Sequence, residues 1–531
     1  MYQALPEKTT LGQLLRQQAA QFADKEFVVF KDRSLSYAQF DAYVDQVARG
    51  LHHMGLRQGD KLAIMLPNGI EFLGLWFACA RLGLIEVPIN TGYKGPLLQH
   101  LLSHSEVQAI ALLPEFHERL QHPSVGFAQI RDVIFCADTD LPAPVDGIRQ
   151  RTFATLLAVQ TPAPEPELRH TDLLAIMYSS GTTGPSKGIL LTHSYFWFSG
   201  YINQRNRKTS PKERMYTCLP LFHANAQLVT TMPALMSGAT LILDDQFSAS
   251  TFWQRLARSR ATRFAYIGGI IPILMKQPPG DFDRLHCVKL ATGGAAPKEL
   301  IAPFIERFGV QLLEGYGQTE NCVALANPSD APRAGSLGKA ICGYDCEVVD
   351  EQDEPLPPGQ VGELVFRPQY PFIMMSGYYK NPEATAAASS NMWFHTGDLM
   401  TKDADGYFYF VDRKKDAIRR RGENISAYEV EMVVNAEPGV LESAAVAVPS
   451  ELGEDELMVF VVRKPGENFS ELGLIQHCEQ LMPYFSVPRY IEVLPELPKT
   501  PTHRVEKYKL RAQGVSASTW DLTASGYQLK K

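Results

Sequence analysis

The residues with the strongest chemical signal form one short loop of Gly, Ser, Thr and Lys. It runs Tyr178-Ser179-Ser180-Gly181-Thr182-Thr183-Gly184-Pro185-Ser186-Lys187-Gly188. Glycines let the backbone approach an anion closely, hydroxyls donate to phosphate oxygens, and a lysine adds positive charge. A Walker A loop needs Gly-Lys followed by Ser or Thr, whereas Lys187 stands between Ser186 and Gly188. The loop therefore predicts phosphate binding of another kind, with a plain Ser/Thr/Gly turn as the alternative.

Apolar segments lie on both sides of this loop. Leu173 to Met177 precede it, and Ile189 to Leu191 follow it. Short apolar runs bounded by turn residues are typical of strands. We therefore expect a hairpin at the loop rather than the start of a helix.

Size and composition limit the classes of protein that the chain can represent. It has 531 residues, 45% of them hydrophobic and 21% charged, and such a length predicts about two to four domains. The net charge of -7 argues against nucleic acid as a partner. The sequence has neither a basic-then-apolar start nor a run of about 18 uncharged apolar residues. We expect a cytoplasmic protein with no stable membrane insertion.

The cysteines do not form a recognisable redox or zinc motif. There are eight of them, and the closest pair, Cys342 and Cys346, lacks the Cys-x-x-Cys spacing. No His or Cys at zinc-binding spacing accompanies this pair. Reduced thiols with structural roles are the prediction.

Helices and strands alternate in the first part of the chain. Thr10 to Gln13 and Ser36 to Gln39 have the form of capping boxes, which begin helices. Leu62 to Leu66 and Leu84 to Val87 are typical of strands on either side of a helix that ends near Arg81. After the second capping box, helical spacing relates Phe40, Val44, Val47, Ala48 and Leu51. Such alternation predicts parallel sheets covered by helices.

A domain boundary is predicted at the charged run from Asp412 to Asp416. After it, strands are expected at Ala444 to Val448, Leu457 to Val462 and Tyr490 to Val493, with a helix near Leu474 to Met482. These elements suffice for a compact α+β unit. The predicted organisation is a domain over 1–411, a hinge over 412–416 and a small domain over 417–531.

Several separate motifs together resemble one family, the adenylate-forming acyl-CoA synthetases, which are related to firefly luciferase and to the adenylation domains of peptide synthetases. The residues of these motifs are most similar to those of the branch of CoA ligases that act on crotonobetaine or carnitine and on fatty acids. The resemblance covers the whole chain, and the motifs besides the Gly181 loop are Gly293-Gly294-Ala295, Glu314 to Glu320, Phe394 to Asp398 and Asp412 to Glu431.

The resemblance implies both a fold and a reaction. The fold is α/β: a large N-terminal domain of parallel-rich sheets with covering helices and a β-rich subdomain, followed by a small mobile α+β domain. The reaction joins a carboxylic acid to AMP at the expense of ATP, with Mg²⁺, and then transfers the acyl group to CoA. Positioned cations would stabilise the charge on the transferring phosphoryl group. A homodimer is compatible with this family.

The resemblance also assigns the nucleotide site. The Gly181 loop with Lys187 would hold the β- and γ-phosphates, Tyr316 would lie against the adenine, and Glu320 would bind Mg²⁺. Asp398 would accept both ribose hydroxyls, and Arg413 would hold the ribose or a phosphate. The implied ATP and AMP contacts are Ser179, Ser180, Gly181, Thr182, Thr183, Gly184, Lys187, Gly293, Gly294, Ala295, Glu314, Gly315, Tyr316, Gly317, Gln318, Thr319, Asp398 and Arg413.

The acyl and CoA sites follow from the same resemblance. His223 would gate or line the acyl pocket, whose implied wall comprises His223, Asn225, Tyr266, Gly268, Gly293 and Gly317. Gly422 would line the pantetheine tunnel, and Lys415 matches the hinge position. The arginines Arg419, Arg420 and Arg421 are candidates for the CoA phosphates, although a basic cluster is also typical of a solvated surface.

One position departs from the family pattern. Near the carboxyl end the family carries Gly-Lys, where this chain has His503-Arg504. The family lysine steadies the carboxylate and α-phosphate, and arginine keeps the charge with a different shape. Three readings follow: Arg504 is the catalytic cation beside Lys187, Thr183 and Glu320, Lys507 replaces it, or adenylation is impaired.

The sequence therefore leaves three functions to compare. The first is an AMP-forming acyl-CoA ligase. The second is a stand-alone adenylating enzyme that loads a carrier protein, and it would form a thioester on a carrier but not on free CoA. The third is a binding protein with lost catalysis, which would bind ATP without releasing AMP.

Overall fold

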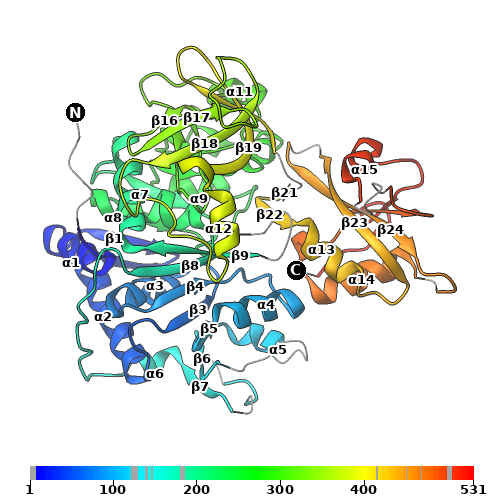
Figure 1. Ribbon diagram of the computed structural model, residues 1–531. Helices are drawn as coiled ribbons and strands as arrows, with labels where there is room; N and C mark the ends of the chain where they lie inside the picture. Colours follow the sequence, from blue (N-terminus) through cyan, green and yellow to red (C-terminus); the bar gives the residue numbers. More distant parts are fainter. Residues whose placement is uncertain are drawn as a thin grey trace.

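The structure is a computed structural model, shown in Figure 1, and it describes most of the chain. The described residues are 8–120, 129–137, 141–144, 147–179, 186–413, 417–450, 453–467, 469–498 and 505–530. Two large sheets, which share the first part of the chain, are followed by a β-rich subdomain and a small C-terminal domain.

The first large sheet contains the predicted hairpin. Within the described residues it has seven strands in the order β7-β6-β5-β3-β4-β8-β9. Neighbouring strands are parallel except β8 and β9, which pair antiparallel with Ser179 opposite Lys187. The strands are β3 (Lys61–Met65), β4 (Ile85–Pro88), β5 (Ala109–Leu112), β6 (Asp132–Phe135), β7 (Arg149–Thr152), β8 (Leu173–Ser179) and β9 (Lys187–Thr192). The predicted hairpin is confirmed.

The second large sheet has nine strands in the described part of the chain, in the order β16-β15-β14-β13-β12-β10-β11-β1-β2. From β1 to β14 its neighbours are parallel, and β2, β15 and β16 pair antiparallel at its edges. The strands are β1 (Glu26–Phe30), β2 (Arg33–Ser36), β10 (Arg214–Thr217), β11 (Thr240–Leu243), β12 (Arg263–Ala265), β13 (Leu290–Gly293), β14 (Gln311–Tyr316), β15 (Leu325–Ala326) and β16 (Lys339–Ala340).

Helices cover and separate these sheets, as the alternation predicts. They are α1 (Leu11–Gln21), α2 (Tyr37–His53), α3 (Ile70–Leu82), α4 (Gly95–Ser105), α5 (His117–Leu120), α6 (Phe153–Leu157), α7 (His193–Asn206), α8 (Met232–Ser237), α9 (Phe252–Arg258), α10 (Ile270–Met275) and α11 (Lys298–Phe308). Both predicted capping boxes form, because Thr10 and Ser36 accept from the N–H groups of Gln13 and Gln39, whose side chains accept in return.

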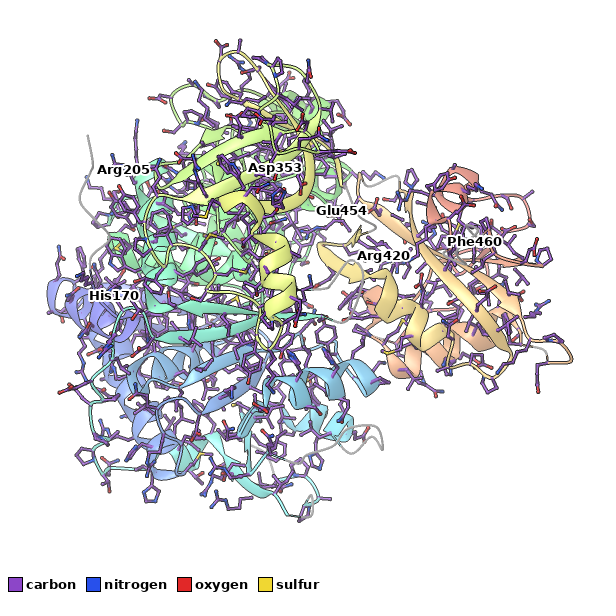
Figure 2. All side chains as sticks on the ribbon, viewed as in Figure 1. His170, Arg205, Asp353, Arg420, Glu454 and Phe460 are labelled. Carbon is purple, nitrogen blue, oxygen red and sulfur yellow. The ribbon has the colours of Figure 1, made fainter. Side chains whose placement is uncertain are left out.

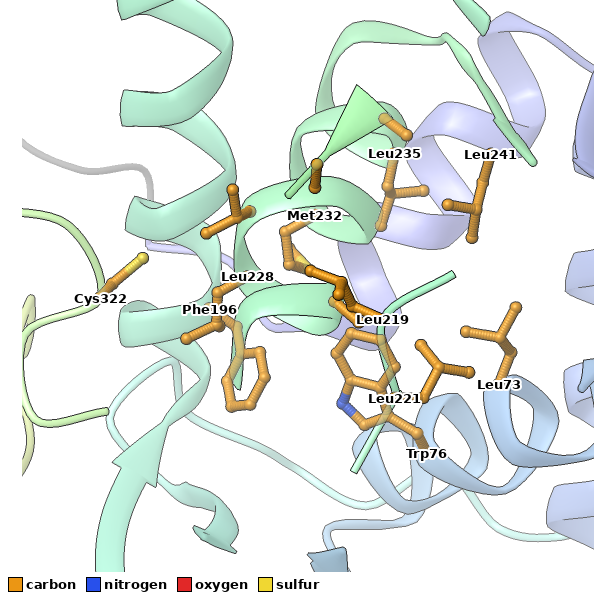
Figure 3. Packing of buried hydrophobic residues seen from close by; sticks show 14 of the residues in the cluster. Leu73, Trp76, Phe196, Leu219, Leu221, Leu228, Met232, Leu235, Leu241 and Cys322 are labelled. Atoms are coloured by element: carbon orange, nitrogen blue, oxygen red, sulfur yellow. The ribbon is translucent and has the colours of Figure 1, made fainter. Parts of the chain in front are cut away.

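The main apolar core lies between the two large sheets. Trp76 of α3, Phe196 of α7 and Met232 of α8 share one buried cluster with Leu62 of β3 and Leu241 of β11. Figure 3 shows this packing around Trp76 and Met232. Because α3 and α7 are buried on nearly all sides, neither shows a strongly amphipathic pattern in sequence.

A β-rich subdomain follows the second sheet, as expected. Its antiparallel strands are β17 (Tyr344–Val349), β18 (Gly362–Pro368), β19 (Phe394–Lys402) and β20 (Phe408–Arg413), with helix α12 (Pro382–Ala388) beside them. The described residues also include short 3₁₀ helices at Pro114–Phe116, Asp281–Asp283, Ser390–Met392 and Tyr484–Ser486.

The small domain begins with a hairpin and continues as an α+β unit. Its elements are β21 (Ala417–Arg420), β22 (Glu423–Ser426), α13 (Ala427–Val434), β23 (Val440–Pro449), β24 (Asp455–Arg463), α14 (Glu471–Leu481), β25 (Tyr490–Leu494), α15 (Lys507–Gln513) and β26 (Trp520–Asp521). All the elements predicted for this region are present. Apolar clusters cover both faces of its four-stranded sheet, and one of them takes in Leu97 of α4.

The chain leaves the β-rich subdomain after Arg413 and enters the small domain at Ala417. Residues 414–416, including Lys415, lie outside the described residues, so the hinge stays a prediction. Within the described residues, no helix combines the length and the apolarity that crossing a membrane requires. All eight cysteines are free thiols, as predicted.

Candidate active site

Two predicted motifs meet at one edge of the nine-stranded sheet. Strands β13 and β14 are parallel neighbours, with Gly293 opposite Glu314. The turn after β13 and the loop after β14 therefore leave the sheet side by side, at the edge where open α/β sheets bind ligands. This edge brings together Gly293-Gly294-Ala295 and the loop from Gly315 to Glu320.

The glycines at this edge are required by close packing. A Cβ atom on Gly293 would lie 2.2 Å from the carbonyl oxygen of Tyr266, and one on Gly317 would lie 1.7 Å from that of Cys322. Such distances exclude any side chain without a backbone shift. Ala295 has a φ of 65°, so the turn also contains a left-handed residue.

Glu314 supports the turn from below. Its Oε1 accepts a hydrogen bond of 2.8 Å from the backbone N–H of Ala296. Burial raises the pKa of the Glu314 carboxyl to about 7. The side chain therefore positions the turn.

Asp398 is held by two residues of the β14 loop. It is 6% exposed on β19, and its Oδ2 accepts from the Tyr316 hydroxyl at 2.6 Å and from Gln318 Nε2 at 3.2 Å. Gln318 Nε2 also donates to the Thr396 carbonyl at 3.0 Å. Three predicted nucleotide residues thus form one fixed cluster, although they come from two separate motifs.

Glu320 connects this cluster to the phosphate-loop hairpin. Its Oε1 accepts from the Tyr378 hydroxyl at 2.9 Å, and the Lys187 ammonium lies 4.8 Å from the centre of the Tyr378 ring. Burial raises the pKa of the Glu320 carboxyl. Sequence reasoning missed Tyr378, which lies 58 positions from Glu320 and belongs to no recognised motif.

Some predicted residues lie outside the described part of the chain. Ser179 ends β8, but the loop between the hairpin strands is not described, nor is the segment that carries the candidate catalytic arginine. The backbone of Arg413 pairs with that of Asp398, which brings its strand to the nucleotide cluster. The residues outside the described ranges are Ser180, Gly181, Thr182, Thr183, Gly184, Lys415 and Arg504.

Two segments of the large domain supply most of the predicted acyl wall. A π-helix spans Asn225–Thr231, and the Oδ1 atom of Asn225 is buried without a partner among the described residues. Tyr266 is fully buried, and its hydroxyl likewise has no described partner. A Cβ on Gly268 would lie 2.3 Å from the Ala295 carbonyl oxygen, so this glycine packs on the nucleotide turn.

The β21–β22 hairpin of the small domain reaches the acyl wall. Glu423 Oε1 lies 2.9 Å from Nε2 of His223. Gly422 has a φ of 80°, and a Cβ there would lie 2.0 Å from Cδ1 of Ile267. Glu454 joins the two domains, because it accepts from the N–H groups of Gly269 at 3.1 Å and Gly422 at 3.0 Å, and Figure 2 shows it at their junction.

The three consecutive arginines have different surroundings. Arg420 is 2% exposed, its Nε lies 2.6 Å from Glu456 Oε2, and it donates to the carbonyls of Phe485 and Val487. It is labelled in Figure 2, within the small domain. Arg421 is exposed and Arg419 is partly exposed. Because Arg420 is committed to the small domain's interior, we remove it from the candidate CoA contacts.

A second interdomain contact was not expected from the sequence. Ser186, at the end of the phosphate loop, donates its backbone N–H to Glu429 Oε1 at 3.0 Å, and its hydroxyl donates to the same oxygen. Glu429 lies in α13, where its position three residues after Ser426 indicates only a helix start. No local signal distinguishes a carboxylate that caps its own helix from one that also contacts another domain.

Two family models match the chain in the same order as its domains. The model of the AMP-binding enzyme matches residues 15–379, and that of the AMP-binding enzyme C-terminal domain matches residues 429–504. Among curated proteins, a crotonobetaine/carnitine–CoA ligase from Salmonella paratyphi A is 33% identical over 516 residues, covering 94% of this chain and 99% of the relative.

Solved structures have a similar fold. An o-succinylbenzoate–CoA synthetase from Bacillus subtilis, solved as a double mutant, has a TM-score of 0.81 at 22% identity, covering 95% of this chain and 99% of its own. An amide bond synthetase from Marinactinospora thermotolerans has a TM-score of 0.82 at 24% identity, covering 94% and 99%. At these identities the likeness concerns the fold.

Proposed function

This chain belongs to the family of AMP-binding enzymes, and from that premise we propose which of its residues carry out each step. It is an acid–thiol ligase that activates a carboxylic acid with ATP to an acyl-adenylate and transfers the acyl group to CoA. The observation that carries the assignment is the meeting of the β13 turn, the β14 loop, Asp398 and the Gly422 hairpin at one sheet edge.

Asp398 is proposed to hold the ribose. A carboxylate has two acceptor oxygens, and the hydrogen bonds from Tyr316 and Gln318 to Oδ2 fix its orientation before the nucleotide binds. The hydrogen bond also sets the angle of the Tyr316 ring, the proposed face for adenine. The Gly293 and Gly317 backbones would lie along the adenylate, at strand ends where close packing leaves no room for a side chain.

Glu320 fits a role in binding Mg²⁺. Magnesium prefers hard oxygen ligands and is commonly held by one or two carboxylates together with substrate phosphates. Among the described residues no group of three or more His, Cys, Asp or Glu encloses an ion, so a single buried carboxylate beside phosphates is the fitting arrangement. When bound, the ion would neutralise charge on the phosphates. Tyr378 fixes the Glu320 carboxylate, and Lys187 supplies a second positive charge.

Arg504 is proposed as the cation for adenylation. The alternative, Lys507, lies 2.7 Å from Glu431 Oε1 through its Nζ atom, which ties it to α13 of the small domain. The Lys507 ammonium would have to break this ion pair in order to reach the reacting phosphate. Guanidinium is also a strong partner for carboxylate and phosphate.

The acceptor and the acid complete the proposal. Gly422 and the exposed Arg421 are proposed to line the path of the pantetheine arm and to meet the CoA phosphates, with Arg419 beside them. The curated relative is named for crotonobetaine and carnitine, so a betaine-type acid is one candidate, beside short, medium and aromatic acids. The predicted homodimer and cytoplasmic location stay predictions.

The first experiment is a screen of AMP release over these acids, with and without CoA. We expect AMP release in both cases with at least one acid and acyl-CoA only when CoA is present. Carrier-protein loading predicts a thioester on a carrier but none on CoA. ATP binding with no AMP release for any acid would instead indicate impaired adenylation.

The second experiment assigns the adenylation cation. Arg504→Ala should abolish acid-dependent pyrophosphate exchange, whereas Lys507→Ala should leave it nearly unchanged. The reverse pattern would assign the role to Lys507. Arg511→Ala, in α15, is a control for loss of positive charge in the same region.

A further inference from the structure

Three consecutive acidic residues lie where strand β24 begins, and all three contact the β21–β22 hairpin of the small domain. They are Glu454, Asp455 and Glu456. Asp455 Oδ2 accepts a hydrogen bond of 2.8 Å from the backbone N–H of Arg419. Glu456 forms the ion pair with Arg420 described above. Both contacts lie within the small domain, so they hold the hairpin against β24 wherever that domain lies.

Glu454 contacts both domains. Its Oε2 accepts from the N–H of Gly422, in the turn of the hairpin, at 3.0 Å. Its Oε1 accepts from the N–H of Gly269, in the large domain, at 3.1 Å. Figure 2 shows Glu454 between the two domains and Arg420 beside it in the small domain. One carboxylate therefore joins the two backbones, with one oxygen for each.

Both backbone partners of Glu454 stand at the predicted acyl wall. Gly269 follows Gly268, the wall residue that packs on the nucleotide turn. Gly422 packs on Ile267, because a Cβ atom there would lie 2.0 Å from Cδ1 of that side chain. Since Gly422 is proposed to line the path of the pantetheine arm, the distance between the hairpin turn and this wall sets the width of the path.

A carboxylate is the group that fits this position. Gly269 is buried, and a buried backbone N–H is nearly always paired, here with Glu454. An ionised carboxylate offers two acceptor oxygens and no donor, which matches two N–H groups that point at it from opposite sides. An amide would offer one acceptor and turn its NH₂ group toward the second N–H. A Cβ atom on Gly269 would lie only 3.1 Å from Glu454 Oε1, so the two domains meet closely at this contact.

The other contacts between the domains lie elsewhere. Glu423 reaches the side chain of His223, and Glu429 reaches Ser186 at the end of the phosphate loop. These contacts would still hold the small domain in place without Glu454, but they would not fix the turn that carries Gly422. The groups proposed to bind the nucleotide are held by residues of the large domain, as described above. A change at Glu454 should therefore affect one step of the reaction and spare the other.

We propose that Glu454 is a positioning residue for the transfer step: it holds the turn at Gly422 against the acyl wall and so sets the width of the path along which the thiol of CoA reaches the acyl group. This inference rests on the proposed acyl-CoA ligase function. Glu454 acts through the two glycine backbones, so it contacts neither the adenylate nor CoA and takes no part in adenylation.

The test measures the two half-reactions separately in Glu454→Ala. Transfer from preformed adenylate to CoA should slow about 30-fold, because the variant loses two charge-assisted hydrogen bonds that water replaces in part. Pyrophosphate exchange should stay within about twofold of the wild-type rate, which also shows that the variant folds. Transfer to hydroxylamine, a small nucleophile that does not need the pantetheine path, should change much less than transfer to CoA.

Matched variants sharpen the result. Glu454→Gln keeps one acceptor oxygen and should lie between the wild type and Glu454→Ala in the rate of transfer to CoA. Glu467→Ala removes an exposed carboxylate beyond the other end of β24 and should leave both half-reactions unchanged. Equal losses in both half-reactions of Glu454→Ala would overturn the inference, as would equal losses with hydroxylamine and CoA or no loss at all.

Hydrogen exchange separates this inference from the proposed function, because it needs no catalysis. In the wild type the N–H of Gly269 is bonded to Glu454, so the peptide that contains Gly269 should exchange faster in Glu454→Ala and as before in Glu467→Ala. Faster exchange supports the contact even if no acid releases AMP, a result that would count against the proposed function alone. Unchanged exchange in Glu454→Ala would contradict the inference even if the wild type is fully active.

Discussion

The two carboxylates proposed to bind the nucleotide and its metal ion are held differently from several polar groups of the acyl half. In the nucleotide half, Asp398 is held by Tyr316 and Gln318, and Glu320 is held by Tyr378. In the acyl half, the described residues leave the hydroxyls of Thr230 and Tyr266 and the Oδ1 atom of Asn225 without partners. One half is preorganised, and the other keeps unused hydrogen-bonding capacity.

This difference fits what each half must recognise. ATP is always the same ligand, so groups fixed in advance bind it without reorganisation. The acid is what distinguishes one ligase from another, and a site with buried polar groups strongly rejects a substrate that cannot satisfy them. The residues that bind ATP and the residues that choose the acid thus lie in different places, with the β13 turn between them.

The largest expected effect tests whether the nucleotide half is generic. Asp398→Ala should lower kcat/KM about 1,000-fold, because two charge-assisted hydrogen bonds to ribose are each worth about 1.5–3 kcal/mol. The loss should be the same for every acid. It is measured as AMP release with saturating acid and varied ATP. If the loss differed between acids, Asp398 would also contribute to the choice of acid, and the two halves would not act separately.

A suitable control for that substitution is Asp405→Ala. Asp405 is a carboxylate of the same subdomain and pairs with Arg333 at 2.9 Å. It lies outside the nucleotide cluster, so this variant should keep the activity of the wild type.

The next effect concerns Glu314, which supports the turn between the two halves. Its carboxyl has a pKa raised by burial to about 7, against 4.5 ordinarily. The folded state therefore binds this proton more tightly than the unfolded state, and the resulting stability is full below about pH 4.5 and is lost as the pH rises through 7. Glu314→Gln replaces the carboxyl with a group that does not lose a proton. At pH 8.5 this variant should therefore have a free energy of unfolding about 3 kcal/mol higher, at about 1.4 kcal/mol per pKa unit.

Thermal unfolding at pH 5 and at pH 8.5 measures this prediction. The gain should be about 3 kcal/mol at pH 8.5 and below about 1 kcal/mol at pH 5, with the preference among acids unchanged. The exposed Glu306→Gln serves as the control and should show no such dependence on pH. A stabilisation that is equal at both pH values would show that the proton on Glu314 is not its cause.

The same division explains how much the sequence could predict. The nucleotide half consists of contiguous motifs on strand ends and a hairpin, so the motifs that carry the family resemblance name Gly293, Tyr316 and Asp398, which the fold brings to one sheet edge. Helix α7 is buried on nearly all sides, which removes the amphipathic pattern that would reveal its orientation.

Long-range pairs account for the remaining misses. Arg420 and Arg421 are adjacent in one basic run, but Arg420 is buried and Arg421 is exposed. The difference arises because Glu456, on strand β24, pairs with Arg420. Tyr378 reaches Glu320 only through the fold. Local spacing carries no information about such partners, since they depend on how the sheets and domains pack.

The smallest effect tests whether the small domain takes part in choosing the acid. Glu423 reaches the acyl half through His223 at 2.9 Å, so it contacts the predicted wall. Glu423→Ala should slow transfer of the acyl group from preformed adenylate to CoA about 10-fold, the scale of one partly buried hydrogen bond. The rate of pyrophosphate exchange, which measures adenylation, should stay within about twofold of the wild-type rate. A contact made only during transfer should affect only the transfer step.

Glu423→Gln keeps an oxygen acceptor for His223 and should lose less than the alanine variant. Neither variant should alter the preference among acids for AMP release, since the expected loss is confined to the transfer step. If Glu423→Ala instead shifted that preference, the docked hairpin would belong to the acid-selecting surface. The small domain would then take part in choosing the acid as well as in transferring the acyl group.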